Sequence, residues 1–253
     1  MEDHHPAQTE APPESYHFLI RRLHSLSGLI PVGVFLIMHL ATNASILVPG
    51  KPGAEFQTSV ERIHALGPLL VPVEIVGIFI PLAFHAIIGF QIIFTGKSNA
   101  QHYPYGGNIR YTLQRWTGVI AFFFIMYHVW QMHWIGKPLG GGGFALHSEA
   151  GDPTGAMTTA AAIQSSWWVA PLYGLGIIAA VYHLANGIWT ALITWGITIQ
   201  PRSQRAAGYA CTAIGILIGA LGLGALTGFK NFDRNKPPPA ATEHATKVDR
   251  NQH

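Results

Sequence analysis

Long stretches without a charged side chain constrain the fold of this chain more than any other feature. Only 11% of the residues are charged, whereas an average soluble domain has about 25%. Five windows lack charge, apart from Glu74 in the second: 23–50, 63–96, 116–136, 153–201 and 206–229. Each window can hold the roughly 20 apolar residues that cross a bilayer as a helix. The sequence therefore predicts an all-α integral membrane bundle of five transmembrane helices, at about 23–48, 68–95, 112–135, 167–199 and 205–229.

The polar segments predict the domain organisation. Residues 1–15 form a polar N-terminal tail, residues 16–232 the membrane domain and residues 233–253 a flexible C-terminal tail that contains three consecutive prolines. The glycine-rich stretch 136–166 is too polar to span a membrane and is predicted to be an outer loop.

Positive charges predict the orientation. With a cytoplasmic N-terminus, the outer loops carry three basic residues and the inner segments carry seven. The inner residues are Arg21, Arg22, Lys97, Arg110, Arg115, Arg202 and Arg205. This bias favours a cytoplasmic N-terminus and, with five helices, an external C-terminus, although the basic C-terminal tail runs against the rule.

Cys211 is the single cysteine of the chain. A disulfide, a cysteine-ligated iron–sulfur cluster and a Cys-x-x-Cys-His haem attachment are therefore excluded within this chain. The net charge of +3 comes mostly from short loops and the tail. We interpret it as a topology signal and not as a nucleic-acid-binding surface.

Four of the fourteen histidines lie deep in predicted helices, one in each of the first four: His39, His85, His128 and His183. Each histidine alone could be a core residue that bonds to a neighbouring helix. Ionisable groups inside a membrane are nevertheless functional candidates. Cofactor sites in helix bundles are built from side chains on facing helices, so four such histidines on four helices favour a cofactor site. At about 1.5 Å per residue, His39 and His128 lie about 12–15 Å from the outer helix ends. The other two lie about 24–25 Å from those ends. The spacing thus predicts two pairs at two depths.

Two imidazoles at one depth suit six-coordinate haem iron, whereas zinc would require about four ligands in one shell. Small residues follow or precede each histidine at helical spacing. Gly89 follows His85 by four positions, and Gly187 follows His183 by four. Gly28 precedes His39 by eleven positions, and Thr117 precedes His128 by eleven. These spacings predict that the small residues face the same interior as the histidines and let a flat macrocycle approach. The alternative is that small residues only tighten helix packing.

Glu74 precedes His85 by eleven residues and is the lone carboxyl inside a predicted span. It should face the interior about 16 Å nearer the outer surface than His85, close to the outer histidine pair. Without an obvious cationic partner, it could exchange protons with a quinone. The alternative is a protonated side chain bonded to a backbone carbonyl near Pro72.

Over about residues 16–230, the sequence resembles the membrane-anchor cytochrome b of succinate:quinone oxidoreductases, in the single-chain, five-helix, dihaem class. The matching stretches are Arg-Arg-Leu-His-Ser (21–25), Pro-Val-Gly-Val-Phe-Leu-Ile-Met-His (31–39), Pro-Leu-Ala-Phe-His (81–85), Leu-Gln-Arg-Trp-Thr-Gly (113–118), Tyr-His-Val-Trp (127–130), Tyr-His-Leu-Ala-Asn-Gly-Ile-Trp (182–189), Thr-Trp-Gly-Ile-Thr (194–198) and Pro-Arg-Ser-Gln-Arg (201–205).

The resemblance implies two haem b groups, a distal one on His39 and His128 and a proximal one on His85 and His183. It implies that Ser25, Ser27 and Arg115 contact haem propionates. It also implies a bacterial cytoplasmic membrane location and two partners, a flavoprotein with FAD and an iron–sulfur subunit. The role of Glu74 at a quinone is our own hypothesis and is not implied by the family.

The expected function is electron transfer between a cytoplasmic succinate/fumarate module and a membrane quinone, most simply menaquinone, with no dicarboxylate chemistry in this chain. One alternative is a dihaem cytochrome b of another quinone-linked oxidoreductase. The quinol:cytochrome c reductase version places two histidines on each of two helices, a pattern that this sequence lacks. The other alternative is a proton-coupled transporter whose histidines and Glu74 relay protons.

Overall fold

The computed structural model describes residues 14–51, 53–95 and 106–235, and these residues fold as an all-α bundle without a β-strand. The predicted tails fall largely outside the described residues. Helix I consists of α1 (Glu14–Ser27), a π-helical segment η1 (Gly28–Gly33), α2 (Val34–Ala44) and η2 (Ser45–Leu47). Helix II consists of η3 (Gly67–Leu69), α4 (Leu70–Glu74), a π-helical segment η4 (Ile75–Phe79) and α5 (Ile80–Thr95). The remaining long helices are α6 (Gly106–Met132), α8 (Val169–Thr194) and α9 (Pro201–Lys230).

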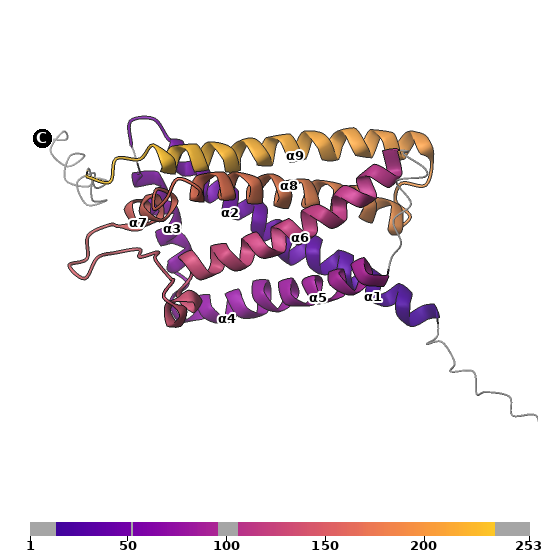
Figure 1. Ribbon diagram of the computed structural model, residues 1–253, viewed down its shortest axis with the longest axis horizontal. Coiled ribbons are helices and arrows are strands. Elements are labelled where there is room, and N and C mark those ends of the chain that lie inside the picture. Colours follow the sequence, from indigo (N-terminus) through magenta and orange to yellow (C-terminus); the bar gives the residue numbers. More distant parts are fainter. Residues whose placement is uncertain (1–13, 52, 96–105, 236–253) are drawn as a thin grey trace, which may run out of the picture.

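The long helices run side by side between two ends of the bundle (Figure 1). One end, here the loop end, carries α3 (Ala54–His64) and α7 (Gly155–Ile163). The other, the basic end, carries the starts of α1, α6 and α9 and the ends of α5 and α8, with Arg21, Arg22, Arg110, Arg202 and Arg205. The described chain thus begins at the basic end and finishes at the loop end, as an odd number of crossings requires.

Length and composition make four of the described helices candidate membrane spans: Phe18–Leu47, Gly67–Thr95, Val169–Thr194 and Pro201–Lys230. The fifth predicted span lies in α6, which is long enough at 27 residues but is less apolar. Gln114, Arg115 and His128 all lie within it. The crossing by α6 therefore remains a prediction.

Several predicted boundaries were wrong. The fourth helix was expected to continue to residue 199, but α8 ends at Thr194, where Gly196 adopts a left-handed φ of 73° that stops the helix. The third was expected over 112–135 and instead occupies Gly106–Met132. Residues 136–166 do not span, as predicted, but they contain α7, and the preceding outer segment contains α3, which was not predicted.

The π-helical segments change which residues share a face. A π turn closes i→i+5 hydrogen bonds and holds an extra residue compared with an α turn, so it rotates the following side chains by about 100°. The segment η1 surrounds Pro31, whose nitrogen has no hydrogen to donate, and η4 comes just before Pro81. A spacing of eleven residues across either segment therefore does not by itself place two side chains on the same face of the helix.

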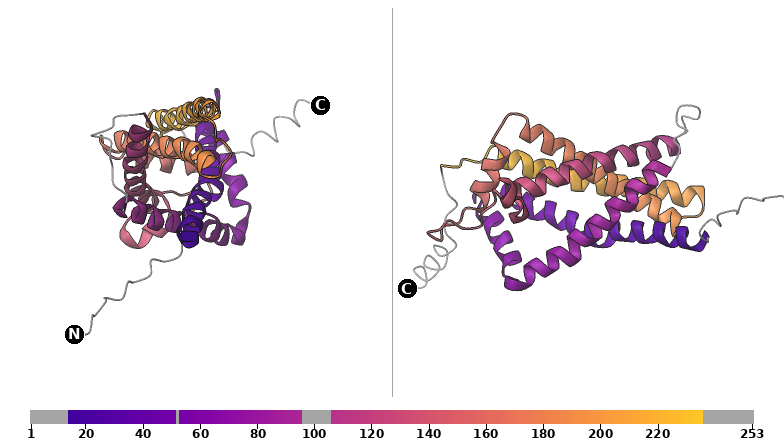
Figure 2. Two further views of the ribbon diagram at one scale, coloured as in Figure 1. Left: turned by 90° about the vertical axis from the view of Figure 1, so that its right-hand side faces the viewer. Right: turned by 60° about the horizontal axis from the view of Figure 1, so that its bottom comes forward.

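The α9 helix contains no histidine and lies at one side of the bundle (Figures 1 and 2), where it packs against α8 and α2. A core of buried side chains under the loop end joins α3, α7, α8 and α9 and includes Phe56, Ile163, Val169 and Phe229. The α9 helix therefore contributes to the packing of the bundle.

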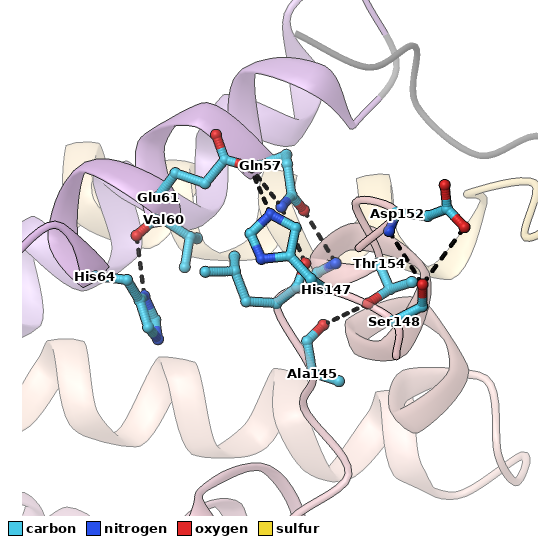
Figure 3. Close-up of polar contacts among 11 residues, drawn as sticks. Gln57, Val60, Glu61, His64, Ala145, His147, Ser148, Asp152 and Thr154 are labelled. Atoms are coloured by element: carbon cyan, nitrogen blue, oxygen red, sulfur yellow. Dashed lines mark hydrogen bonds and ion pairs between the residues drawn. The ribbon is translucent and has the colours of Figure 1, made fainter. Parts of the chain in front are cut away.

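Polar contacts fix the loops over this core (Figure 3). Gln57 is only 4% exposed. Its amide donates to Glu61 Oε1 and to the Leu146 carbonyl, and its Oε1 accepts from the Gly155 backbone, so one side chain joins α3 to the start of α7. The His147 ring contacts Glu61 at 3.2 Å on the exposed side. The segment 136–166 is thereby held as a cap on the loop end.

Candidate functional site: paired histidines inside the bundle

The structure brings the four intramembrane histidines together in two pairs. His85 from α5 and His183 from α8 have ring centroids 6.0 Å apart, and His39 from α2 and His128 from α6 have ring centroids 5.7 Å apart. Counted at 1.5 Å per residue from the helix ends at the loop end, His39 and His128 lie about 12 and 6 Å deep, whereas His85 and His183 lie about 27 and 21 Å deep. We call them the loop-end pair and the basic-end pair.

The ring separations fit two imidazoles that share one metal ion. A histidine nitrogen lies about 2 Å from the metal that it binds. When two histidines bind one ion from opposite sides, their ligating nitrogens therefore lie about 4 Å apart, and their ring centroids lie farther apart. Separations of 6.0 and 5.7 Å meet this requirement. By contrast, His24 and His85 stack face to face with centroids 4.0 Å apart, which leaves no room for an ion between them.

Backbone carbonyls orient both histidines of the basic-end pair in the same way. His85 Nδ1 lies 2.8 Å from the His24 carbonyl, and His183 Nδ1 lies 3.0 Å from the Gln114 carbonyl. A carbonyl only accepts, so each Nδ1 carries the hydrogen and each Nε2 keeps its lone pair. Metal-ligating histidines are held by this kind of outer hydrogen bond, which fixes the tautomer and the ring orientation.

A glycine lies directly against each of these rings. A Cβ at Gly28 would overlap the His85 ring, and a Cβ at Gly118 would lie 2.8 Å from His183 Cε1. The sequence placed Gly28 on the interior face of helix I, and the structure puts it there, against His85. Sequence spacing had also chosen Thr117 in place of Gly118, whereas the Thr117 hydroxyl donates to the Leu113 carbonyl of its own helix.

Gly89 and Gly187 complete a repeated arrangement. A Cβ at Gly89 would lie 3.3 Å from the His24 ring, and one at Gly187 would lie 3.6 Å from Gln114 Nε2. The same arrangement therefore occurs twice. Helices I and II supply it at residues 24, 28, 85 and 89, and α6 and α8 supply it at residues 114, 118, 183 and 187. The four-residue spacing within each helix was visible in the sequence, but nothing there paired His24 with Gln114.

A cavity of about 430 Å³ surrounds the basic-end pair between helices I and II, α6 and α8. This volume is within the range of about 300–1,000 Å³ that is typical of cofactor sites. Of the residues predicted to surround a haem, the cavity is lined by Ser25, Gly28, Gly89, Arg115 and Gly187. Ser27 and Thr117 are not part of its wall. The Ser27 hydroxyl instead donates to the His24 carbonyl at 2.9 Å.

His24 lies at the start of the first predicted span and was not among the four deep histidines, but it lines this cavity. Its Nδ1 is buried and has no hydrogen-bond partner among the described residues. A buried polar atom without a partner in a mostly apolar cavity points to a polar group of a ligand. Arg115, which also lines the cavity, donates to the Ile92 carbonyl and lies over the Tyr111 ring.

The loop-end pair is held by polar side chains. His128 Nδ1 lies 3.2 Å from the Tyr173 hydroxyl, which donates to Gln131 Oε1 at 2.7 Å, so His128 donates to the tyrosine and Nε2 stays free. The Asn43 amide lies 3.4 Å from His39 Nε2 and donates to the His39 carbonyl. An amide NH₂ facing Nε2 is compatible with a lone pair on that nitrogen.

Glu74 has a partner that the sequence did not predict. Its Oε2 lies 3.4 Å from His133 Nε2, and the two side chains are 21% and 23% exposed. His133 Nδ1 accepts from the Ile135 backbone, so Nε2 carries the hydrogen that points to Glu74. The sequence did not predict this contact, because His133 comes from the turn after α6 and not from a helix face. With Nδ1 accepting and Nε2 donating, the His133 ring is a hydrogen-bond partner of Glu74 and not a cationic one.

Two comparisons with known proteins agree with each other. The family model described as succinate dehydrogenase/fumarate reductase transmembrane subunit matches residues 103–222. The succinate dehydrogenase cytochrome b558 subunit of Bacillus subtilis (strain 168) is 37% identical over 212 residues, which cover 84% of this chain and 96% of the relative. The aligned region includes most of the bundle described above.

Proposed function

The chain belongs to the family of succinate dehydrogenase and fumarate reductase transmembrane subunits, and we propose that it binds two haem b groups, one at each histidine pair. It is the cytochrome b membrane anchor of a succinate:quinone oxidoreductase complex. Haem iron supplies one-electron transfer, and two such groups at two depths supply an electron path across the membrane.

The geometry of the basic-end pair is the observation that carries the proposal. Two imidazoles on facing helices are spaced for one iron, each is fixed through Nδ1 by a carbonyl, and each faces a glycine. His85 and His183 would hold one iron and His39 and His128 the other. His24, Ser25 and Arg115 lie where they could meet the propionates of a haem in the cavity, whereas Ser27 bonds within its own helix.

The partners and orientation follow from the same premise. We propose that the basic end faces the bacterial cytoplasm and docks an iron–sulfur subunit, which receives electrons from a flavoprotein with FAD. The loop end then lies at the outer face of the membrane, and residues 16–232 form the membrane domain. The quinone, in our proposal menaquinone, reacts near the loop-end pair. The excess of arginine at the basic end supports this orientation.

Succinate should reduce haem in the assembled complex. In membranes that contain the whole complex, anaerobic succinate is expected to produce the absorption bands of reduced haem b, and malonate, a competitive dicarboxylate, should prevent it. Absorption spectra recorded before and after addition check this. Haem that dithionite reduces but succinate leaves oxidised would contradict an electron connection to the dicarboxylate module.

The Glu74–His133 pair is proposed to move protons at the quinone. Glu74→Gln keeps the size of the side chain but cannot accept a proton, so quinone-dependent turnover should fall by roughly tenfold or more, the range of acid–base catalysis being about 10²–10⁴. Haem content and succinate reduction of haem should not change. His133→Gln should give a smaller decrease in the same direction, because water can replace its contact.

Glu61→Gln is the matched control, since Glu61 also pairs with a histidine at the loop end, His147 at 3.2 Å. It lies in α3, outside the predicted spans, and its replacement should leave quinone turnover unchanged. Equal activity of the Glu74 and Glu61 variants would remove Glu74 from the proposed chemistry. Loss of haem in Glu74→Gln would assign it a structural role instead.

A further inference from the structure

A second cavity, of about 360 Å³, lies at the basic end, apart from the histidine pairs. It opens between the starts of α6 and α9 and the last turns of α8. Two arginines line it, Arg110 from α6 and Arg205 from α9, together with Trp189 and the exposed Tyr209. Nothing in the electron-transfer function uses these residues.

Arg110 is held in place inside this cavity. Its guanidinium lies over the Trp189 ring, 4.4 Å from the ring centre, and Trp189 Nε1 in turn donates to the Gln204 carbonyl at 2.8 Å. Gly208 leaves space beside it, because a Cβ there would lie 3.5 Å from both terminal nitrogens of Arg110. The guanidinium is therefore positioned before any ligand arrives, which lowers the entropic cost of binding.

The positive charge of the cavity has no ion-pair partner in the part of the chain that the structure describes. No Asp or Glu occurs anywhere in α6, α8 or α9 or in the segments 96–105 and 195–200 that precede α6 and α9. Among the described residues, neither Arg110 nor Arg205 forms an ion pair. Two arginines around one cavity suit an anionic group with several acceptor oxygens, such as a phosphate.

For a bilayer surface near the start of α9, the cavity would lie at the depth of the lipid headgroups. Arg205 and Tyr209 lie about 6 and 12 Å along α9 from its first residue, Pro201, and the interfacial layer on one side of a bilayer is about 5–8 Å thick. Tyr209 is 77% exposed on the flank of the bundle, and tyrosine and tryptophan favour this interface. A ligand there can place its charge between the arginines and its apolar part along Tyr209.

We propose that this cavity binds the phosphate-bearing headgroup of an anionic phospholipid from the adjacent leaflet, with Arg110 and Arg205 as phosphate ligands. Basic pockets between transmembrane helices on the cytoplasmic side are suited to such headgroups. The bound lipid joins α6, α8 and α9 at the end where the other subunits are proposed to dock.

Native mass spectrometry of the purified, delipidated holocomplex tests the proposal. The complex is titrated with dioleoyl phosphatidylglycerol and, separately, with dioleoyl phosphatidylcholine, and bound lipid is counted. The wild type should retain one phosphatidylglycerol with an affinity that exceeds that for phosphatidylcholine. Arg110→Gln and Arg205→Gln should each weaken that site by roughly fivefold or more, the effect expected of one basic residue near an anionic headgroup.

Arg202→Gln is the matched control, because Arg202 is exposed in the first turn of α9 but does not line the cavity. It should keep the site. Gly208→Leu, which fills the cavity and keeps all charges, should lose it, so the test does not depend on arginine variants alone. Haem absorption of every variant verifies that the anchor has folded.

Three results would overturn the proposal. Equal binding of the two lipids, or equal losses in all three arginine variants, would leave only nonspecific attraction. Competition by millimolar inorganic phosphate with no lipid preference would assign the cavity to free phosphate. Binding of phosphatidylglycerol only after the iron–sulfur subunit has been removed would make the cavity a contact with that subunit.

Discussion

His85→Ala and His183→Ala should each reduce haem from two groups per chain to one, and so should His39→Ala and His128→Ala. In the proposed arrangement the iron at each site would be held by one histidine from each of two helices, so loss of either histidine should release that haem. The rings of each pair are 6.0 or 5.7 Å apart, a separation that fits one iron held between them. Pyridine haemochrome assays on purified variants measure the result.

Double variants test the pairing itself, because two changes at one site cannot remove a second haem. His85→Ala combined with His183→Ala should still leave one haem, whereas His39→Ala combined with His85→Ala should leave none. His64→Ala is the control, since His64 lies in α3 and bonds to the Val60 carbonyl. One haem remaining in the His39/His85 double variant would refute the pairing.

Gly28→Ala and Gly118→Ala should each remove most of the haem at the basic-end pair while the loop-end haem remains. A methyl group at residue 28 would overlap the His85 ring, and one at residue 118 would lie 2.8 Å from His183 Cε1. Either ring must then rotate or shift, which breaks its Nδ1 bond to the carbonyl of His24 or Gln114. The expected loss is more than half of one haem per chain, measured by haemochrome assay and by redox titration that separates the two haems.

Gly77→Ala is the matched control for this prediction. Gly77 lies in helix II, and a Cβ there meets nothing within 4 Å. Its replacement should leave both haems in place. If Gly28→Ala retained both haems with unchanged potentials, the close contact between Gly28 and His85 would have no role in holding the cofactor.

The two histidine pairs could be predicted from sequence because their evidence was local. Uncharged windows fixed the helices, and the distance of each histidine from a helix end fixed its depth. The all-α bundle that results has the predicted chain order, and the structure pairs His39 with His128 and His85 with His183.

Features that depend on helix phase or on loops could not be predicted. The π-helical segments η1 and η4 lie between Gly28 and His39 and between Glu74 and His85, so two of the three eleven-residue spacings assumed a regularity that these helices lack. The Glu74–His133 contact depends on the turn after α6. Gly118 was passed over for Thr117 because the spacing from His128 was counted along one helix, whereas the contact is with His183 on another.

His24 illustrates the same limit. Its position near a predicted helix end suggested solvent, yet α1 begins at Glu14 and carries it into the cavity beside His85. The carbonyl of His24 fixes the His85 ring, and the His24 ring stacks on it. No count along helix I alone reveals that role, since it requires knowledge of how helices I and II pack.

The haem-to-chain ratio of the purified wild-type complex tests the central claim most directly. Haem is counted by pyridine haemochrome and the chain by quantitative amino-acid analysis of the separated subunit. Two histidine pairs, each spaced for one iron, predict a ratio of two. A ratio of one in fully active complex would contradict the account, because one of the two pairs would then hold no haem.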